Sequence, residues 1–185
     1  MALSVFHKPP QHGDTERPAP RWAMRTAYAL PLLLLPSCLW RLPFAFGFEM
    51  GQVDTGGLPS RWISIPYVFG LSVLSEVIAF LCLGLVRGWG ETVPGRVPFL
   101  GGRRVRPLAA VVPAVLGGSI LTLLFTAVPI GDGRRLTLLG TVHDVGYANQ
   151  AWRTLALVCT APTIIWGPTV LALAAAYHHR RRPTR

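Results

Sequence analysis

The chain has 185 residues, of which 51% are hydrophobic and only 14% carry a charged side chain. A water-exposed surface needs many more charges, so the composition excludes an ordinary soluble domain and favours the lipid bilayer as solvent. The net charge of +10 does not indicate nucleic-acid binding, because the basic residues form short clusters between long apolar runs and follow no single polar face.

The chain begins with a polar, proline-rich segment at 1–25, which predicts a flexible cytoplasmic tail because it offers no periodic apolar face. The first apolar run, at 26–48, is long enough to span the hydrocarbon core of a bilayer. A cleaved signal peptide is the alternative, since basic residues precede this run and small residues lie near its end. The apolar core exceeds that of a signal peptide, so a retained helix is favoured.

Three further apolar runs, at 62–86, 107–130 and 154–177, are each long enough to cross a bilayer and are almost free of charge. Together the four runs predict an all-α integral membrane four-helix bundle, followed by a basic tail at 178–185. Every run contains proline, which frees a backbone carbonyl that must find another partner in lipid. We therefore expect proline-kinked helices that pack against their neighbours.

The distribution of basic residues predicts the orientation of the chain. Thirteen lysines and arginines lie in the two terminal tails and the second loop, whereas four lie in the first and third loops. The positive-inside bias places both termini in the cytoplasm, with the protein in a bacterial plasma membrane. The basic loops are also suited to contact with anionic lipid headgroups.

Small residues recur at four-residue intervals in the third run, at Ala110, Ala114, Gly118 and Thr122. This spacing predicts a stripe along one helix face that lets another backbone approach closely. The stripe fits either a central packing helix within the monomer or the contact surface of a homodimer or a larger membrane complex.

Glu76 lies near the middle of the second run, where a carboxyl is costly in lipid and should face protein, water or a partner. Ser72 and Ser75 share its helix face and offer hydroxyl groups. A carboxyl buried without a cation can stay protonated near neutral pH, so Glu76 is the candidate proton carrier or acid/base catalyst. The alternative is a structural carboxyl that is hydrogen-bonded between helices.

Arg41 is the second charge within an apolar run. It lies close enough to the outer end of the first run for its side chain to reach the headgroups. If it turns inward, an offset of about 10 Å along the helix axis favours a water-mediated link to Glu76 over a direct ion pair. Arg41 belongs to a set of candidate binding residues whose other members are Ser72, Ser75, Glu49 and Asp144. Glu49 and Asp144, together with Asp54, stand in the expected outer loops and could bring a second acid to Glu76.

No spacing of histidine, cysteine or acidic residues predicts a metal or cofactor site. Cys38, Cys82 and Cys159 stand singly in three different runs, without a CxxC pair. The adjacent side chains of His143 and Asp144 do not converge on one ion. We expect the loop that contains them to be a solvated cap on the bundle.

The loop after the second run carries a recognisable pattern. It extends from Trp89, Gly90 and Glu91 through Pro94, Arg96, Val97 and Pro98 to Gly102, Arg103, Arg104 and Val105, then 109–114. This pattern resembles small multi-spanning membrane proteins common in Streptomyces and related actinobacteria, whose motif commonly has Arg-Trp where this chain has Gly95 and Arg96. The predominance of arginine over lysine agrees with GC-rich coding. The resemblance implies a membrane location and an actinobacterial source, and it transfers no catalytic residue.

Two main classes of function fit these features. The first is a non-enzymatic transport, export or complex-assembly subunit, which explains the small-residue stripe, the minimal loops and the single deep carboxyl. The second is a membrane-embedded enzyme that acts on an isoprenoid or quinone-like substrate with Glu76 as acid or base. Such enzymes combine two or more acid/base groups in a cavity, so the first class is favoured. A sensor or regulator is a third, less favoured class.

Overall fold

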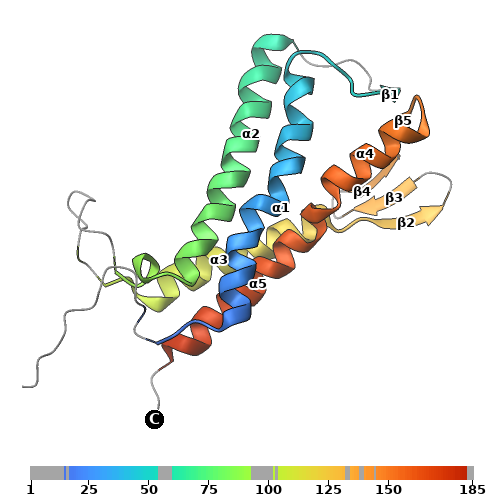
Figure 1. Cartoon of the computed structure of the whole chain (residues 1–185). Helices are drawn as coiled ribbons and strands as arrows, with labels where there is room; N and C mark the ends of the chain where they lie inside the picture. Colours follow the sequence, from blue (N-terminus) through green and yellow to red (C-terminus); the bar gives the residue numbers. More distant parts are fainter. Residues whose placement is uncertain are drawn as a thin grey trace, which may run out of the picture.

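The computed structural model describes residues 15, 17–53, 60–92, 102, 104–131, 134–137, 140–143 and 145–182. Within this part the chain is mostly helical (Figure 1). Its α-helices are α1 (Arg21–Ala45), α2 (Arg61–Leu81), α3 (Pro107–Phe125), α4 (Gln150–Thr160) and α5 (Pro162–Arg181). Two short 3₁₀ helices, η1 (Cys82–Leu85) and η2 (Gly88–Gly90), follow α2.

Among the described residues, four helical segments are long and apolar enough to cross a membrane: Arg21–Ala45, Arg61–Leu85, Pro107–Phe125 and Gln150–Arg181. In lipid, a helix satisfies its backbone hydrogen bonds internally, which is why apolar runs of this length adopt that form. Large apolar side chains such as Leu32, Trp62 and Leu116 are exposed on the outside of these helices. The prediction of four long apolar helices that pack together is confirmed, and it indicates a multi-span membrane protein.

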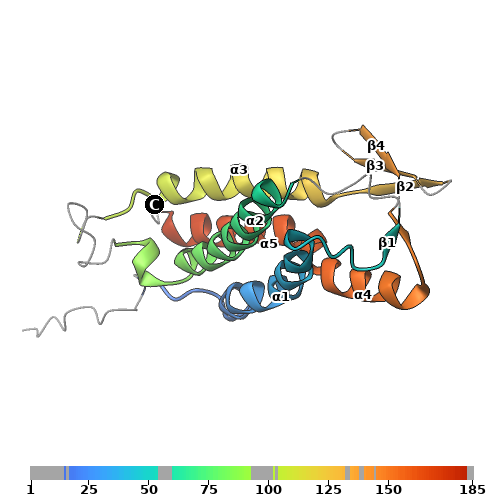
Figure 2. The ribbon, with the colours of Figure 1, turned by 90° about the horizontal axis from the view of Figure 1, so that it is seen from above.

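The helices pack as two pairs, α1 with α2 and α3 with α5 (Figure 1). The two pairs lie at an angle to each other and meet where α1 begins and α5 ends. Seen from above, α2 crosses over α5 between α1 and α3 (Figure 2). Helix α4 leads directly into α5 at Ala161, and α4 also contacts α1.

The core lies between α1 and α5. Ala23, Ala27, Leu30 and Leu34 recur at three- and four-residue spacing on α1 and are almost fully buried. They pack with a matching set on α5, which comprises Trp166, Val170, Leu173 and Tyr177. The two alanines leave room for the bulkier side chains of α5, so this contact joins the two helix pairs.

The predicted stripe of small residues on α3 meets α5 at one close contact. A Cβ atom added to Gly167 of α5 would lie 2.3 Å from the backbone nitrogen of Thr122 and 2.7 Å from the carbonyl oxygen of Gly118. Gly118 is buried, whereas Ala110 and Ala114 are partly exposed. Part of the stripe therefore contacts another helix within the monomer.

The expectation of an all-α chain omitted two small antiparallel sheets at the end of the molecule away from η1 (Figure 1). The first has the order β2 (Val128–Gly131), β3 (Arg134–Thr137) and β4 (Gly140–His143). The second pairs β1 (Gln52–Val53) with β5 (Gly146–Tyr147) and so ties the α1–α2 connection to the segment before α4. These strands are only two to four residues long, too short for an alternation of apolar and polar residues to mark them.

Several helix boundaries also differ from the expected ones, among them the end of α1, which lies at Ala45 and not at 48. Helix α3 ends at Phe125 and not at 130: Thr126 is extended, and Pro129, which disfavours helical backbone in the residue before it, follows in β2. The fourth segment begins at Gln150 and not at 154, because the side chain of Asn149 caps it by accepting a hydrogen bond from the backbone nitrogen of Trp152 at 3.0 Å. Residues 21–25 and 178–181, expected in the tails, are helical in α1 and α5.

Candidate functional site

A groove of about 500 Å³ runs along one face of the α1–α2 pair. Its polar side chains are Cys38 from α1 and Ser72 and Glu76 from α2. The rest of its lining is apolar and comprises Pro31, Leu39, Leu42, Phe69, Val73, Val77, Phe80 and Leu81. The groove therefore presents one carboxyl in an otherwise apolar surface.

Glu76 is half-buried, and its Oε1 atom is covered and has no hydrogen-bond partner in the described part of the chain. Its carboxyl lies beside the thiol of Cys38. Cys38 and Ser72 hold the two helices together, because the Ser72 hydroxyl donates to the Cys38 carbonyl at 3.5 Å and the Cys38 thiol donates to the Ser72 carbonyl at 3.7 Å. Because the half-buried Glu76 also lines the groove, its carboxyl can accept a hydrogen bond from a molecule that lies there.

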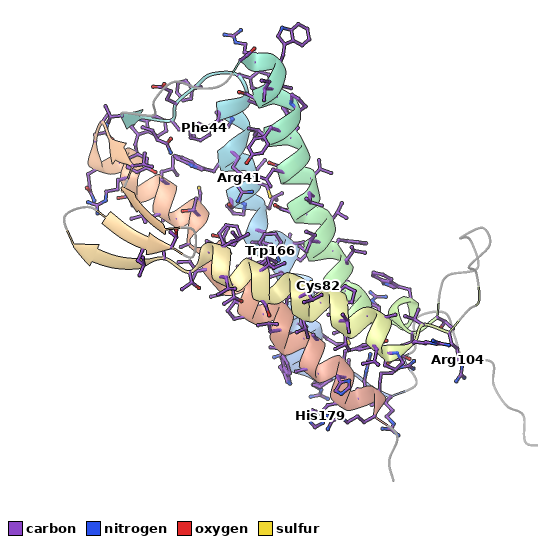
Figure 3. All side chains as sticks on the ribbon, turned by 180° about the vertical axis from the view of Figure 1, so that it is seen from behind. Arg41, Phe44, Cys82, Arg104, Trp166 and His179 are labelled. Carbon is purple, nitrogen blue, oxygen red and sulfur yellow. The ribbon has the colours of Figure 1, made fainter. Side chains whose placement is uncertain are left out.

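Arg41 turns toward α2 and does not point away from the helix pair. Its guanidinium donates a long hydrogen bond of 3.5 Å to the hydroxyl of Ser75, which itself donates to the Leu71 carbonyl at 2.8 Å. Figure 3 shows Arg41 at the level of the upper part of α1. Among the described residues, Arg41 and Glu76 form no ion pair within 4.0 Å, so the two charges share a neighbourhood without direct contact.

Of the loop acids expected to approach Glu76, only Glu49 belongs to the described residues, and Asp54 and Asp144 do not. Glu49 is exposed beyond the end of α1, where its backbone carbonyl accepts a hydrogen bond from Gln52 at 2.9 Å. Glu76 is fifteen residues from the start of α2, which is about 22 Å along the helix, so Glu49 is far from it. In the described part of the chain, Glu76 stands without a second acid.

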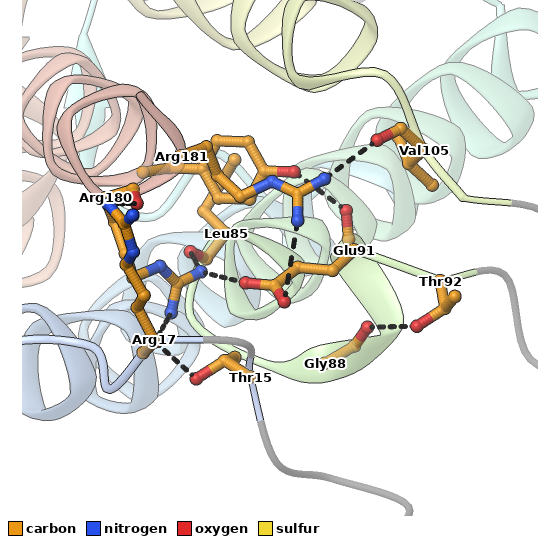
Figure 4. A network of polar contacts seen from close by, with 11 residues as sticks. Thr15, Arg17, Leu85, Gly88, Glu91, Thr92, Val105, Arg180 and Arg181 are labelled. Carbon is orange, nitrogen blue, oxygen red and sulfur yellow. Dashed lines mark hydrogen bonds and ion pairs between the residues drawn. The ribbon is translucent and has the colours of Figure 1, made fainter. Parts of the chain in front are cut away.

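A second polar cluster, which we call the Glu91 cluster, lies at the opposite end of the helices (Figure 4). Glu91 follows η2 and pairs with Arg180 at 3.0 Å and with Arg181 at 3.8 Å, both near the end of α5. The side chains of Glu91 and Arg180 are each only 5% exposed. The basic tail that we expected at anionic headgroups thus contributes two arginines to a buried ion pair.

Backbone carbonyls complete the Glu91 cluster. Arg180 donates to the Leu85 carbonyl at 3.1 Å, and Arg181 donates to the Val105 carbonyl at 3.2 Å. The hydroxyl of Tyr177 donates to the Gly90 carbonyl at 3.0 Å. The cluster therefore fastens η1, η2 and the segment that leads into α3 to the end of α5.

Two glycines allow the chain to turn tightly below this cluster. A Cβ atom added to Gly90 would lie 1.8 Å from the carbonyl oxygen of Gly84, and one added to Gly84 would lie 2.7 Å from the ring of Trp89. The Trp89 ring also stacks on Phe80, with ring centres 6.5 Å apart. The close turn brings Glu91 under α5, within reach of the two arginines.

The N-terminal segment reaches the same end of the molecule. Arg17 donates to the carbonyls of Arg180 and Arg182 at 3.3 and 3.0 Å, and Arg180 donates in return to the Arg17 carbonyl at 3.3 Å. The sequence contains one signal for this cluster, which is that Glu91 is the single acid among five arginines between 87 and 106. The pairing joins positions about 90 residues apart, so it could not be assigned from local spacing.

Neither polar region contains a cluster of three or more histidine, cysteine or acidic side chains that could hold a metal ion, as far as the structure describes the chain. No family model, curated protein or solved structure matches this chain.

Proposed function

We propose that this protein is a multi-pass bacterial plasma-membrane protein that acts as a small transport, export or complex-assembly subunit, with Glu76 as its binding group. The observation that carries the proposal is the groove between α1 and α2, in which the one carboxyl has a covered oxygen without a described partner. Such a carboxyl can accept a hydrogen bond from a lipid-soluble molecule or from a polar side chain of a partner helix.

The proposed orientation has both termini in the cytoplasm. The contacts of Arg17 with Arg180 and Arg182 support it, because they bring the start of α1 and the end of α5 to the same side. The arginine-rich connection before α3 lies at that side as well, since Arg181 binds the Val105 carbonyl. The positive-inside bias assigns this side to the cytoplasm.

The enzyme alternative receives less support. Acid/base catalysis on a lipid-soluble substrate normally uses at least two convergent groups in a cavity that excludes water. In the described structure Glu76 lies beside a thiol and hydroxyl groups, with Arg41 in the same neighbourhood but not in contact with it. Its groove opens on one face of the helix pair. Binding and release therefore fit this site better than a chemical step does.

Glu76→Gln is expected to abolish function, because glutamine keeps the shape of the side chain and removes its acidity. We would compare metabolites in cells and medium from a host that expresses the wild type, Glu76→Gln or an empty vector, and proteins that co-purify with each variant. A compound that moves unchanged between cell and medium, or a partner that co-purifies, should require Glu76.

Glu49→Gln is the matched control, because Glu49 is an exposed carboxyl outside the groove. It should behave as the wild type. Identical profiles and identical co-purified proteins for the wild type and Glu76→Gln, with both variants present in the membrane at equal levels, would contradict the role of Glu76. A compound that is chemically converted only when Glu76 is present would instead support the enzyme.

A further inference from the structure

A second groove, of about 470 Å³, lies between α3 and the end of α2 and does not include Glu76. One wall is formed by small residues of α3, and the other by larger apolar residues of α2 and η1. The residues from α3 are Ala109, Ala110, Pro113, Ala114, Gly117 and Leu121. Two members of the small-residue stripe, Ala110 and Ala114, thus line this groove where α5 does not cover them.

The size and direction of the groove fit an acyl chain. From Ala109 to Leu121 the groove follows α3 for about 18 Å, close to the ~15 Å depth of one leaflet of the hydrocarbon core. A helix of about 10 Å diameter over that length would need roughly 1,400 Å³, about three times the volume of the groove. A flexible acyl chain can therefore lie along the groove, whereas a helix of that diameter would lie mostly outside it.

Two exposed arginines stand at one end of the groove, on the same stretch of chain as Val105. Gly90 and Val105 line that end. Val105 stands between the exposed side chains of Arg104 and Arg106, and its carbonyl accepts the hydrogen bond from Arg181. Figure 3 shows Arg104 beside the start of α3, before its first helical turn. A negative headgroup at this position would lie directly above an apolar channel for its tail.

We propose that this groove binds an anionic phospholipid, with one acyl chain along α3 and the phosphate near Arg104 and Arg106. Charge complementarity selects the headgroup, since each basic residue close to the bilayer surface attracts anionic lipid. The small side chains of Ala110 and Ala114 and the open position at Gly117 leave room for the tail on this face of α3. The site depends on membrane insertion alone, and it is independent of the binding role proposed for Glu76.

The test is native mass spectrometry of the detergent-purified protein, mixed with equal amounts of phosphatidylglycerol and phosphatidylcholine that carry identical acyl chains. The wild type should retain phosphatidylglycerol in preference to phosphatidylcholine. Arg106→Gln should reduce this preference about fivefold, and the Arg104→Gln, Arg106→Gln double variant about 25-fold. Arg153→Gln, an exposed arginine on α4, should leave the preference unchanged.

A groove-filling variant tests the position of the tail. Gly117→Leu places a side chain in the groove, and a Cβ atom at Gly117 meets no other atom within 4 Å, so the variant should fold. Gly117→Leu should retain at least tenfold less phosphatidylglycerol than the wild type. Gly70→Leu, at an equally open glycine on α2 outside the groove, should retain lipid as the wild type does. Equal retention of both lipids by the wild type, or unchanged retention by Gly117→Leu, would overturn the proposal.

Discussion

Replacing Glu91 with alanine is expected to lower the free energy of unfolding by about 3–5 kcal/mol, because it leaves two arginines without their shared counter-ion in a place that excludes water. Arg180 cannot easily escape, since its side chain is 5% exposed and also bound to the Leu85 carbonyl. The change should appear as a large fall in thermal stability of the purified protein. It should also release the segment around η2 from the end of α5.

The matched control for this prediction is Glu49→Ala, which removes an exposed carboxyl. Contacts of an exposed carboxyl are screened by water, so this variant should change stability by no more than about 1 kcal/mol. A double variant, Glu91→Ala with Arg180→Met, should recover part of the lost stability, because an apolar side chain replaces the unpaired charge. If Glu91→Ala unfolds at the same temperature as Glu49→Ala, the ion pair does not hold this end of the protein together.

Gly167→Ala is expected to separate α3 from α5 and to destabilise the protein by about 3 kcal/mol, at the upper end of the effect of overpacking. The added methyl group would lie 2.3 Å from the backbone nitrogen of Thr122 and 2.7 Å from the carbonyl oxygen of Gly118. Backbone atoms cannot move aside as a flexible side chain can, so the helices must shift. Thermal unfolding in a fixed detergent would measure the loss.

Gly117→Ala provides the comparison for Gly167→Ala. It makes the same chemical change in the facing helix, at a position where a Cβ atom meets nothing within 4 Å. Alanine favours the helical backbone by up to about 1 kcal/mol relative to glycine, so this variant should be equally stable or slightly more stable than the wild type. Equal stability of Gly167→Ala and Gly117→Ala would contradict the close approach of α3 and α5.

The long helices could be predicted from the sequence because each depends on local properties, namely length and freedom from charge. Helix boundaries that depend on a single turn or cap were harder to predict. Helix α3 stops before Pro129, and Asn149 starts α4 earlier than the apolar run suggests. The short strands between these helices carry no recognisable alternation. Their register is defined by pairing with other strands, such as that of Gln52 with Tyr147, which the local sequence does not encode.

The two polar sites also differ in how far the local sequence predicts them. Glu76 could be singled out because one carboxyl inside a long apolar run is unusual in itself. The Glu91 cluster depends on contacts between η2 and the end of α5, so the arginines near position 180 resemble an ordinary basic tail until the helices are packed. The inward turn of Arg41 to Ser75 likewise depends on where α2 lies. Long-range packing decides each of these contacts.

The four-span fold is tested most directly by the topology of the chain in the membrane. This topology can be mapped with a membrane-impermeant maleimide in a variant that lacks Cys38, Cys82 and Cys159. Single cysteines would replace the exposed residues Glu49 and Ser60 at one end, and Thr92 and Arg182 at the other. We expect the first two positions to be labelled in intact cells and the last two to be labelled only after the cells are opened. Labelling of Thr92→Cys or Arg182→Cys in intact cells would contradict a four-span protein with the Glu91 cluster in the cytoplasm.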